Sequence, residues 1–327
     1  MNAPKDPGQH HDHPGHAPGH AHRHGGSHTQ GHTHGHTHNT VADDLDWELL
    51  ATHLETGGEL HLPAHRSTAA RLRELVGPDR QVRRVLDIGS GPGVMTCVFA
   101  EAFPDAEVVA VDGTPALLDR ALARAERLGL AGRVSVRHAR LPEGLADDAL
   151  GTADLVWSSK AVHHLGDQQG ALDALVRVLR PGGMLAVAEG GLPMRFLPRD
   201  LGFGRPGLQT RLDALQEDRY QAMRAGLPGS VPVVEDWPAM LRRAGLTGTR
   251  AFTTLLDLPA PLGEPGRYFL HSQLTRLRDA SDGSLDAPDM ETLDRLLDPA
   301  APEGLRRRPD VFLLSAATVF AGTRPAR

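Results

Sequence analysis

One short segment limits what this chain can fold into more than any other: residues 85–93, with the sequence VLDIGSGPG. Apolar residues and an acid precede three glycines at alternate positions, and Met95, Val98, Phe99 and Ala102 then follow the spacing of one helix face. The pattern predicts a buried strand, a tight turn and a helix. Glycine permits unusual backbone angles and the close approach of a ligand, and a helix N-terminus presents unpaired N–H groups. The segment therefore predicts a cradle for a small, electron-rich molecule.

Strand and helix signals alternate through the rest of the chain. Apolar stretches predict strands at 107–112, 133–137, 154–159, 184–188, 249–256 and 311–320. Helical spacing lies between them, for example after Pro115, which suits a first helical position. The residues RPGG at 180–183 form a sharp turn before the fifth strand. Alternation of this kind predicts an α/β fold: a doubly wound, mostly parallel sheet with helices on both faces.

Composition divides the chain into three parts. Residues 1–40 are a His-rich tail with little to bury, so disorder is expected. Residues 41–80 predict a helical lid, with one helix that ends at Gly57-Gly58 and a second from His65 to Val76. Its histidines, such as His53 and His61, are of a kind that more often packs or faces solvent than contacts a ligand. Residues 81–327 are the main domain, with insertions at about 190–230 and 260–305 that are expected to cap the sheet edge.

Charge and cysteine content exclude several classes of protein. The formal net charge of -6 argues against a nucleic-acid partner. No apolar run approaches the roughly 20 residues that a membrane helix needs, and no apolar secretory signal is expected at the N-terminus. Cys97 is the single cysteine, which rules out a disulfide within the chain and disfavours a thiolate metal site. A cytoplasmic location without membrane association is expected.

The tail has its own chemistry. Twelve of the nineteen histidines lie between His10 and His38, and His32, His34, His36 and His38 alternate with small residues. Neutral imidazole binds zinc, nickel and copper. The tract is either a solubilising tail with incidental metal affinity or a selected metal-storing or metal-sensing segment. It lacks the cysteines of a zinc finger.

Acids beside the glycine turn narrow the choice of ligand. Asp87 stands two residues before the first glycine, and Asp112 ends the next predicted strand. Dinucleotide oxidoreductases use a glycine turn without the first acid, because a carboxylate there repels a pyrophosphate. A carboxylate instead favours a cofactor that carries an ammonium group. A nicotinamide oxidoreductase is therefore the disfavoured alternative.

Together these motifs resemble the seven-strand S-adenosylmethionine-dependent methyltransferases. Residues 85–93 resemble the family's first motif, Asp112 the acid that holds the ribose hydroxyls, 156–165 the motif after the fourth strand, and 179–183 the turn before the fifth. The resemblance covers residues 82–190 well, and 230–258 and 311–322 more weakly. It implies the strand order 3-2-1-4-5-7-6, with the last strand antiparallel. It implies a cofactor site made of Asp87, Gly89, Ser90, Gly91, Gly93, Asp112, Gly113, Thr114, His138, Ala139 and Ser159. His138 departs from the pattern, because the family often has an acid there for the adenine amino group.

Catalysis would need little beyond positioning, because the methyl donor is already activated. A base is needed only if the acceptor must lose a proton. His163 and His164 follow the fourth strand and are the candidate bases, with a local packing or hydrogen-bonding role as the alternative for His164. Glu189, at the end of the fifth strand, is a second candidate.

The sequence does not identify the acceptor. The insertions over the sheet edge predict an enclosed pocket for a small molecule, with an apolar one among the candidates. Arsenic is disfavoured because Cys97 stands alone. The acceptor atom and the oligomeric state stay open. So does a second class of function: a non-catalytic metal-binding or partner-binding protein on a methyltransferase-like scaffold.

Overall fold

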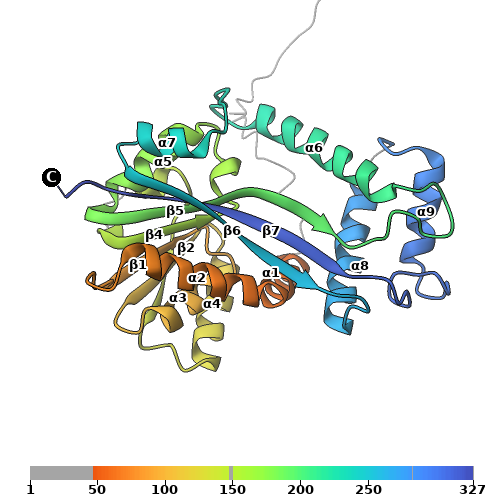
Figure 1. The fold of residues 1–327 in the computed structure, drawn as a ribbon, viewed down its shortest axis with the longest axis horizontal. Helices are drawn as coiled ribbons and strands as arrows, with labels where there is room; N and C mark the ends of the chain where they lie inside the picture. Colours follow the sequence, from red (N-terminus) through yellow and green to blue (C-terminus); the bar gives the residue numbers. More distant parts are fainter. Residues whose placement is uncertain (1–46, 147–149, 282, 327) are drawn as a thin grey trace, which may run out of the picture. The chain divides into compact units, whose positions relative to one another are not determined.

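The computed structural model describes residues 47–146, 150–281 and 283–326, and within them seven strands form one sheet. The strands lie in the order β3-β2-β1-β4-β5-β7-β6 (Figure 1). All neighbours pair in parallel except β7, which is antiparallel to both β5 and β6. The predicted fold class and strand order are confirmed. The strands are β1 (Arg84–Ile88), β2 (Glu107–Asp112), β3 (Val134–His138), β4 (Ala153–Ser159), β5 (Leu179–Arg195), β6 (Thr247–Leu258) and β7 (Leu313–Thr323).

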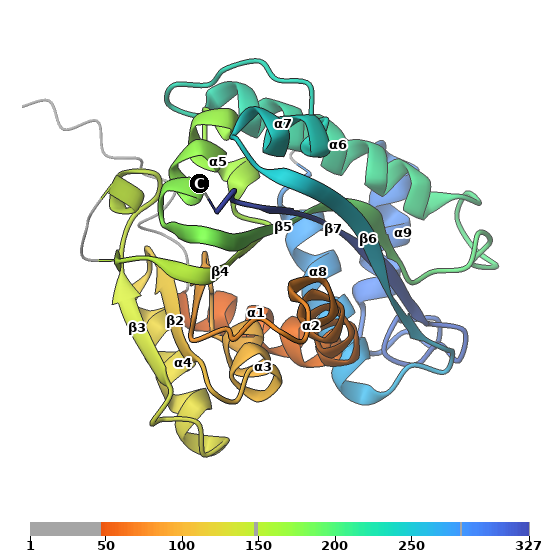
Figure 2. The same ribbon diagram turned by 60° about the vertical axis from the view of Figure 1, so that its left-hand side comes forward.

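Helices cover both faces of this sheet (Figure 2). One face carries α2 (Leu62–Val76), α3 (Val94–Ala102) and α4 (Pro115–Arg127), and the other carries α5 (Gln168–Arg177) and α7 (Trp237–Arg243). Of these helices, α2, α4 and α5 bury one apolar face, as the sequence spacing predicts, whereas α3 is buried on all sides from Val94 to Ala100.

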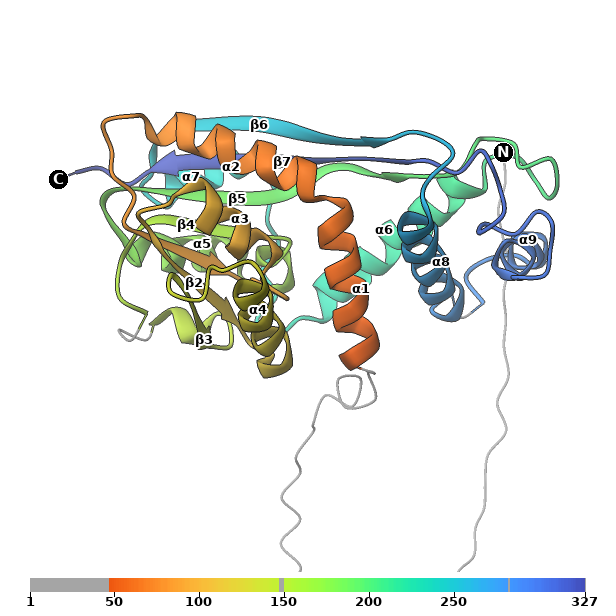
Figure 3. The ribbon, with the colours of Figure 1, turned by 90° about the horizontal axis from the view of Figure 1, so that it is seen from below.

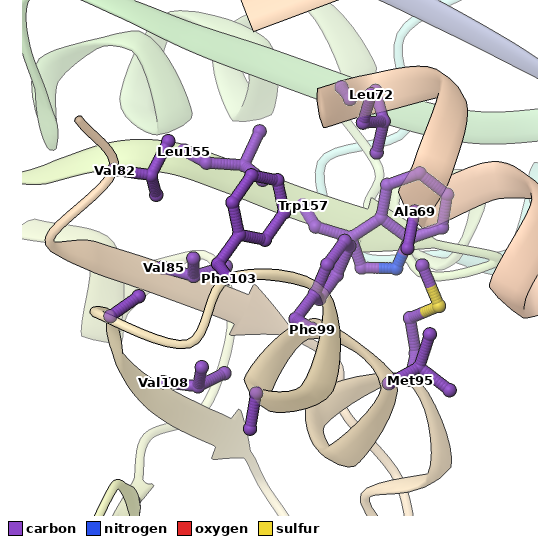
Figure 4. Close-up of a cluster of buried hydrophobic side chains, with 14 of the residues drawn as sticks. Ala69, Leu72, Val82, Val85, Met95, Phe99, Phe103, Val108, Leu155 and Trp157 are labelled. Carbon is purple, nitrogen blue, oxygen red and sulfur yellow. The ribbon is translucent and has the colours of Figure 1, made fainter. Parts of the chain in front are cut away.

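The core under α2 and α3 is aromatic at its centre (Figure 4). The ring of Phe99 on α3 meets Trp157 of β4 edge-on, with 5.7 Å between centroids, and both residues are buried. Such a pair contributes about 0.5–1.5 kcal/mol beyond its buried area. Cys97 lies in the same cluster, and burial raises the pKa of its thiol to about 11, so it is inert packing.

Three strands run on past the rest of the sheet and support a cap (Figure 3). β5 ends at Arg195, beyond its predicted end at 188. It has 17 residues, whereas β1 has five. The correction has a physical reason: Leu192 and Arg195 stay paired with β7 after a register shift at Gly190-Gly191, where φ is positive. The cap helices are α6 (Leu208–Gly226), α8 (Glu264–Asp279) and α9 (Ala287–Leu297), which share a separate leucine-rich core.

The first helix differs from its prediction. α1 (Trp47–Leu60) runs straight through Gly57-Gly58, where the sequence predicted its end. Both glycines are required by close packing: a Cβ on Gly57 would stand 2.9 Å from the Phe269 ring, and one on Gly58 only 2.6 Å from Val94. The two glycines therefore allow neighbouring helices to approach α1 closely, and they do not end it. None of the helices in the described residues is long and apolar enough to span a bilayer.

Candidate cofactor and acceptor site

The parallel strands present their carboxyl ends along one edge, and the predicted cofactor residues gather there. Val111 at the end of β2 accepts hydrogen bonds from the backbone N–H groups of both Gly89 and Ser90, at 2.8 and 3.1 Å. The turn after β1 is thus fastened to the neighbouring strand. This edge is where open α/β sheets bind ligands.

Two glycines of the turn are required by its geometry. Gly89 has φ +73°, and a Cβ there would lie 2.7 Å from the Ala161 side chain in the segment after β4. Gly93 has φ +74° and precedes α3, and a Cβ would lie 2.5 Å from Ala121 of α4. Gly91, between them, faces open space. The turn therefore leaves room over its centre while its flanks are packed.

The carboxylate of Asp112 binds the backbone of this turn. Its Oδ2 accepts from the Gly91 N–H and its Oδ1 from the Thr114 N–H, both at 2.9 Å. A carboxylate offers about four lone-pair sites, and these two bonds occupy one on each oxygen. One acceptor site per oxygen is left, which matches the two O–H donors of a ribose diol.

Asp87 is held in a different way. It is 2 % exposed, and its Oδ2 accepts from the Thr96 hydroxyl at 2.6 Å. Burial, assisted by the charge of Asp112, raises the pKa of Asp87 to about 7. The ligand-free protein therefore holds a carboxyl that a nearby cation would drive to its ionised form.

The adenine end of the predicted site lies at β3. His138 of β3 lies opposite Asp112 of β2 in the strand register. The Nε2–H of His138 donates to the Gly113 carbonyl at 3.0 Å. The N–H of Ala139 donates to the Asp112 carbonyl. The histidine side chain is exposed and tied to backbone, so it cannot accept at Nε2 as the family's acid would. Ser159 ends β4 on the other side of the turn. The structure brings these residues to one edge, and their contact with a cofactor stays a prediction.

His163 and His164 follow β4 in a short turn (Val162–His164) and are not equivalent. The Nδ1–H of His163 donates to Oε2 of Glu189 at 2.7 Å. Glu189 is 4 % exposed, and its Oε1 accepts from the N–H groups of Ala161 and Val162. The carboxylate thus fixes the tautomer of His163 and leaves Nε2 without a proton. His164 is exposed by comparison. Partial desolvation is the main cause that lowers its pKa, and the charge of His163 is the second.

The cap reaches this turn through Arg224. From α6 its guanidinium donates to the carbonyls of His163 and Leu165 at 2.9 and 2.5 Å, and to that of Gly166 at 3.3 Å. Tyr220, one turn earlier, brings its ring to 5.7 Å from that of His163. An insertion distant in sequence therefore holds the candidate base in place.

The lid helices face the same edge. The Nδ1–H of His61 donates to the Gly57 carbonyl at 2.8 Å, and its Nε2 accepts from Ser315 of β7 at 3.1 Å. The His65 ring lies 6.1 Å away, and burial, His61 and Lys160 lower its pKa to about 4. Glu55 and Glu59 of α1 pair with Arg120 and Arg124 of α4, each at 2.5 Å. α1 is thereby fixed beside the helix that Asp112 and Thr114 introduce.

Comparison with known proteins agrees with this geometry. A family model described as a methyltransferase domain matches residues 85–183. This part of the chain is a methyltransferase domain. It spans the glycine turn, Asp112, the turn with His163 and the first residues of β5, where the sequence predicted a turn before the strand.

Curated relatives resemble this domain and little else of the chain. Trans-aconitate 2-methyltransferase of Methylobacterium radiotolerans is 38% identical over 109 residues, which are 32% of this chain and 37% of that protein. The enzyme of the same name from Deinococcus radiodurans is 34% identical over 37% of this chain and 43% of its own. Malonyl-[acyl-carrier protein] O-methyltransferase of Salmonella typhimurium is 35% identical over 41% and 51%. The chain thus spans about half or less of the relatives it matches.

Solved structures of methyltransferases are similar to this chain at low identity. A putative methyltransferase from Bacillus halodurans covers 79% of this chain and 99% of its own, with 18% identity and a TM-score of 0.46. A methyltransferase from Thiobacillus denitrificans, solved with S-adenosylhomocysteine, covers 80% and 92%, with 19% identity and a TM-score of 0.44.

The methyltransferase domain also carries a residue that sequence reasoning missed. Lys160 directly follows β4 and is the one non-glycine residue among those described with a positive φ, +51°. A signal was present: among 35 basic residues, only Lys5 and Lys160 are lysines. A rare residue type within the motif at 156–165 was the cue.

The predicted metal site is a separate matter. His32, His34, His36 and His38 lie outside the described residues. Within residues 47–146, 150–281 and 283–326, no group of three or more His, Cys, Asp or Glu side chains could hold a metal ion. The seven remaining histidines of the chain serve the fold and the edge just described.

Proposed function

We propose that the protein transfers a methyl group from S-adenosylmethionine to a small-molecule acceptor. The observation that carries the proposal is the pair of carboxylates at the glycine turn. Asp112 keeps two acceptor sites free beside Gly91, and Asp87 is buried two residues before the turn with its pKa raised to about 7. A diol and a cation fit such a pair, and a pyrophosphate would be repelled by both acids.

The chain's own residues suit this role. Asp112 would accept from the ribose hydroxyls, the N–H groups of the glycine turn would face the methionine part, and His138 and Ala139 would border the adenine. When bound, the cofactor supplies a methyl group already activated on a sulfonium. The protein then has to position the acceptor and exclude water, and α1, α2 and α6 border the edge where this takes place.

His163 is the group best placed to move a proton. Glu189 holds the Nδ1–H, so Nε2 can accept a proton from a hydroxyl, amine or carbon acid of the acceptor. The resulting imidazolium would be stabilised by the buried carboxylate beside it. His164 lacks such a partner and is the lesser candidate.

Calorimetry with S-adenosylhomocysteine tests the proposal. We expect the full chain to bind it, and Asp112→Ala to lose affinity roughly 10- to 100-fold, the value of one or two hydrogen bonds to a charged group. Gly89→Val should abolish binding, because its side chain would meet Ala161. Asp105→Ala is the matched control: this exposed acid precedes β2, at the opposite end of the strand from Asp112.

Failure has a clear form. A wild-type chain that shows no binding at high micromolar S-adenosylhomocysteine, or that binds NAD as well, contradicts the proposal. Release of S-adenosylhomocysteine from S-adenosylmethionine in the presence of a small-molecule panel then checks turnover.

We also propose that the tail binds zinc, nickel or copper without a role in catalysis, and that the protein acts in the cytoplasm. Twelve histidines between His10 and His38 support the first statement, and the single cysteine supports the second. A chain that begins at residue 41 should keep its turnover and lose the metal. Loss of turnover on removal of the tail would contradict the proposal that the tail has no role in catalysis. Recovery of the protein outside the cytoplasmic fraction would contradict the proposed location.

A further inference from the structure

Lys160 occupies a strained position at the edge of the sheet. Its φ of +51° lies in the left-handed region, which costs a residue with a Cβ about 1–2 kcal/mol. Its N–H donates to the Ala188 carbonyl of β5 at 3.1 Å, which fixes the backbone there. Glycine would fit without strain, as it does at many turns of this chain. Non-glycine residues held in this region mark functional sites more often than chance would place them there.

The side chain of Lys160 makes no hydrogen bond and no ion pair in the part of the chain that the structure describes. Seventeen ion pairs tie these residues together, yet no carboxylate lies within 4 Å of the Lys160 ammonium or of the Arg224 guanidinium. Lys160 is exposed, but surrounding protein desolvates it and lowers its pKa.

Lys160 and the turn that follows it carry two cations against one carboxylate, which favours an anionic ligand. Glu189 is the acid that faces Lys160, and its carboxylate already accepts from His163 and two backbone N–H groups. Arg224 adds a second cation, committed to carbonyls of the same turn. The lid contributes His61 and His65, whose pKa values are lowered by burial and by Lys160, so both are neutral near pH 7. The His65 ring makes no hydrogen bond to the described protein, although its backbone N–H donates to the His61 carbonyl, so the ring can donate one to a ligand.

The position of Lys160 separates it from the cofactor. Ala161, the next residue, packs against Gly89 of the turn, so Lys160 borders the donor end of the site. Its backbone bond goes to β5, the strand on the side away from β1 and Asp112. The cation therefore stands where an acceptor would enter, between the glycine turn and the pair His163–Glu189.

We propose that Lys160 is the specificity-determining cation of the acceptor site, and that the acceptor carries a carboxylate which Lys160 and His65 bind. This rests on the proposed function and deepens it, because it names the acceptor class. The carboxylate is an anchor and takes no part in bond making. A monoanion fits better than a phosphate dianion, since Glu189 opposes a second negative charge. An acceptor of this class differs from the apolar one among the expectations of the sequence.

Matched pairs of small carboxylic acids and their primary amides test this. Each compound is titrated by calorimetry into the full chain saturated with S-adenosylhomocysteine, and assayed for methyl transfer. The best acid should bind at least 10-fold more tightly than its amide. Lys160→Met should weaken that acid about 10- to 100-fold, mainly in KM, and leave the amide unchanged. Lys160→Arg should restore most of the preference. Arg250→Met removes one exposed charge at the opposite end of the sheet and should change nothing.

A second variant separates function from folding. Lys160→Gly should raise the melting temperature, since it relieves the left-handed strain, and should still abolish the preference for acids. The inference is overturned if the Lys160→Met chain keeps that preference, if no acid is preferred by the wild type, or if inorganic phosphate displaces the best acid more effectively than a monocarboxylate does. If Lys160→Met weakens binding of S-adenosylhomocysteine as much as binding of the acid, Lys160 would be assigned to the cofactor's carboxylate. That result would also overturn the inference. Failure of the wild type to bind S-adenosylhomocysteine would instead refute the proposed function.

Discussion

The Nδ1 atom of His163 and the Oε2 atom of Glu189 lie 2.7 Å apart, with the carboxylate almost fully buried. His163 follows β4, and Glu189 lies within the neighbouring strand β5, where the register pairs Ser159 with Ala188. The parallel sheet thus brings an imidazole and an acid together at one edge although 26 positions separate them in the chain. The buried carboxylate thus orients the His163 imidazole through a single hydrogen bond.

Removal of this pair should slow turnover without loss of cofactor. We expect His163→Ala to lower kcat by roughly 100-fold or more, the usual contribution of a general base. Glu189→Gln should lower it less, by about 10-fold, because the imidazole stays but its tautomer is no longer fixed. His164→Ala should keep most of its activity. The measurement is kcat together with the dissociation constant of S-adenosylhomocysteine. Near-wild-type turnover of both His163→Ala and His164→Ala would remove general-base catalysis from the mechanism.

Asp87 should make cofactor binding pH-dependent. Its pKa is about 7 in the free protein. Because a cationic ligand favours the ionised carboxylate, Asp87 should stay ionised to a lower pH in the complex than in the free protein. Affinity for S-adenosylhomocysteine should therefore rise as pH increases from 6 to 7 and level off above pH 7.5. Asp87→Asn should flatten this profile. A profile unchanged in the variant would show that another group titrates.

The same carboxyl should destabilise the ligand-free protein at high pH. A folded-state pKa raised above the unfolded value contributes stability that is complete below about pH 4 and is lost as pH rises through 7. At pH 8 we expect Asp87→Asn to be more stable than wild type, on the order of 2 kcal/mol, because a neutral amide replaces a buried ion. At pH 5 the gain should shrink. Urea unfolding at the two pH values checks the sign, and a larger gain at pH 5 would refute it.

Gly58 gives a prediction in which helix propensity and packing oppose each other. Replacement of a helical glycine by alanine normally stabilises by about 0.5–1 kcal/mol. At Gly58 the added Cβ would lie 2.6 Å from Val94, so we expect a loss of about 1–3 kcal/mol instead. Gly226→Ala is the matched control, since that helical position has open space around it. Thermal unfolding of both variants decides the matter, and a stabilised Gly58→Ala would show that α1 can shift.

Arg224 should link the cap to catalysis. Arg224→Met removes the donors to three carbonyls of the turn that carries His163, so we expect kcat to fall about 10-fold while cofactor affinity is unchanged. Arg219→Met is the control on the same helix, because its guanidinium donates to the Ala280 carbonyl, away from the turn. Equal losses of kcat in the two variants would indicate a general effect of the cap.

Much of the site could be predicted where the signal is local. The glycine turn, Asp112 and the histidines after β4 each sit within a few residues of the strand that positions them, so a motif is enough to place them. Gly57 and Gly58 show the limit of such reasoning: a glycine pair has the same local signature whether it ends a helix or lets two helices approach. Only Phe269 and Val94, at distant positions, distinguish the two cases.

The sequence by itself determined which segments form strands and which residues form the glycine turn, because burial periodicity and backbone preferences are properties of short segments. The order of the strands was implied by the family resemblance of the motifs. The tertiary structure decided the acceptor side of the site. Glu189 orients His163, Arg224 holds its turn across 61 positions, and the charge of Lys160 contributes to the lowered pKa values of His61 and His65 of the lid. These contacts depend on how separate elements pack, and the free energy of packing is set by surfaces that no single segment contains.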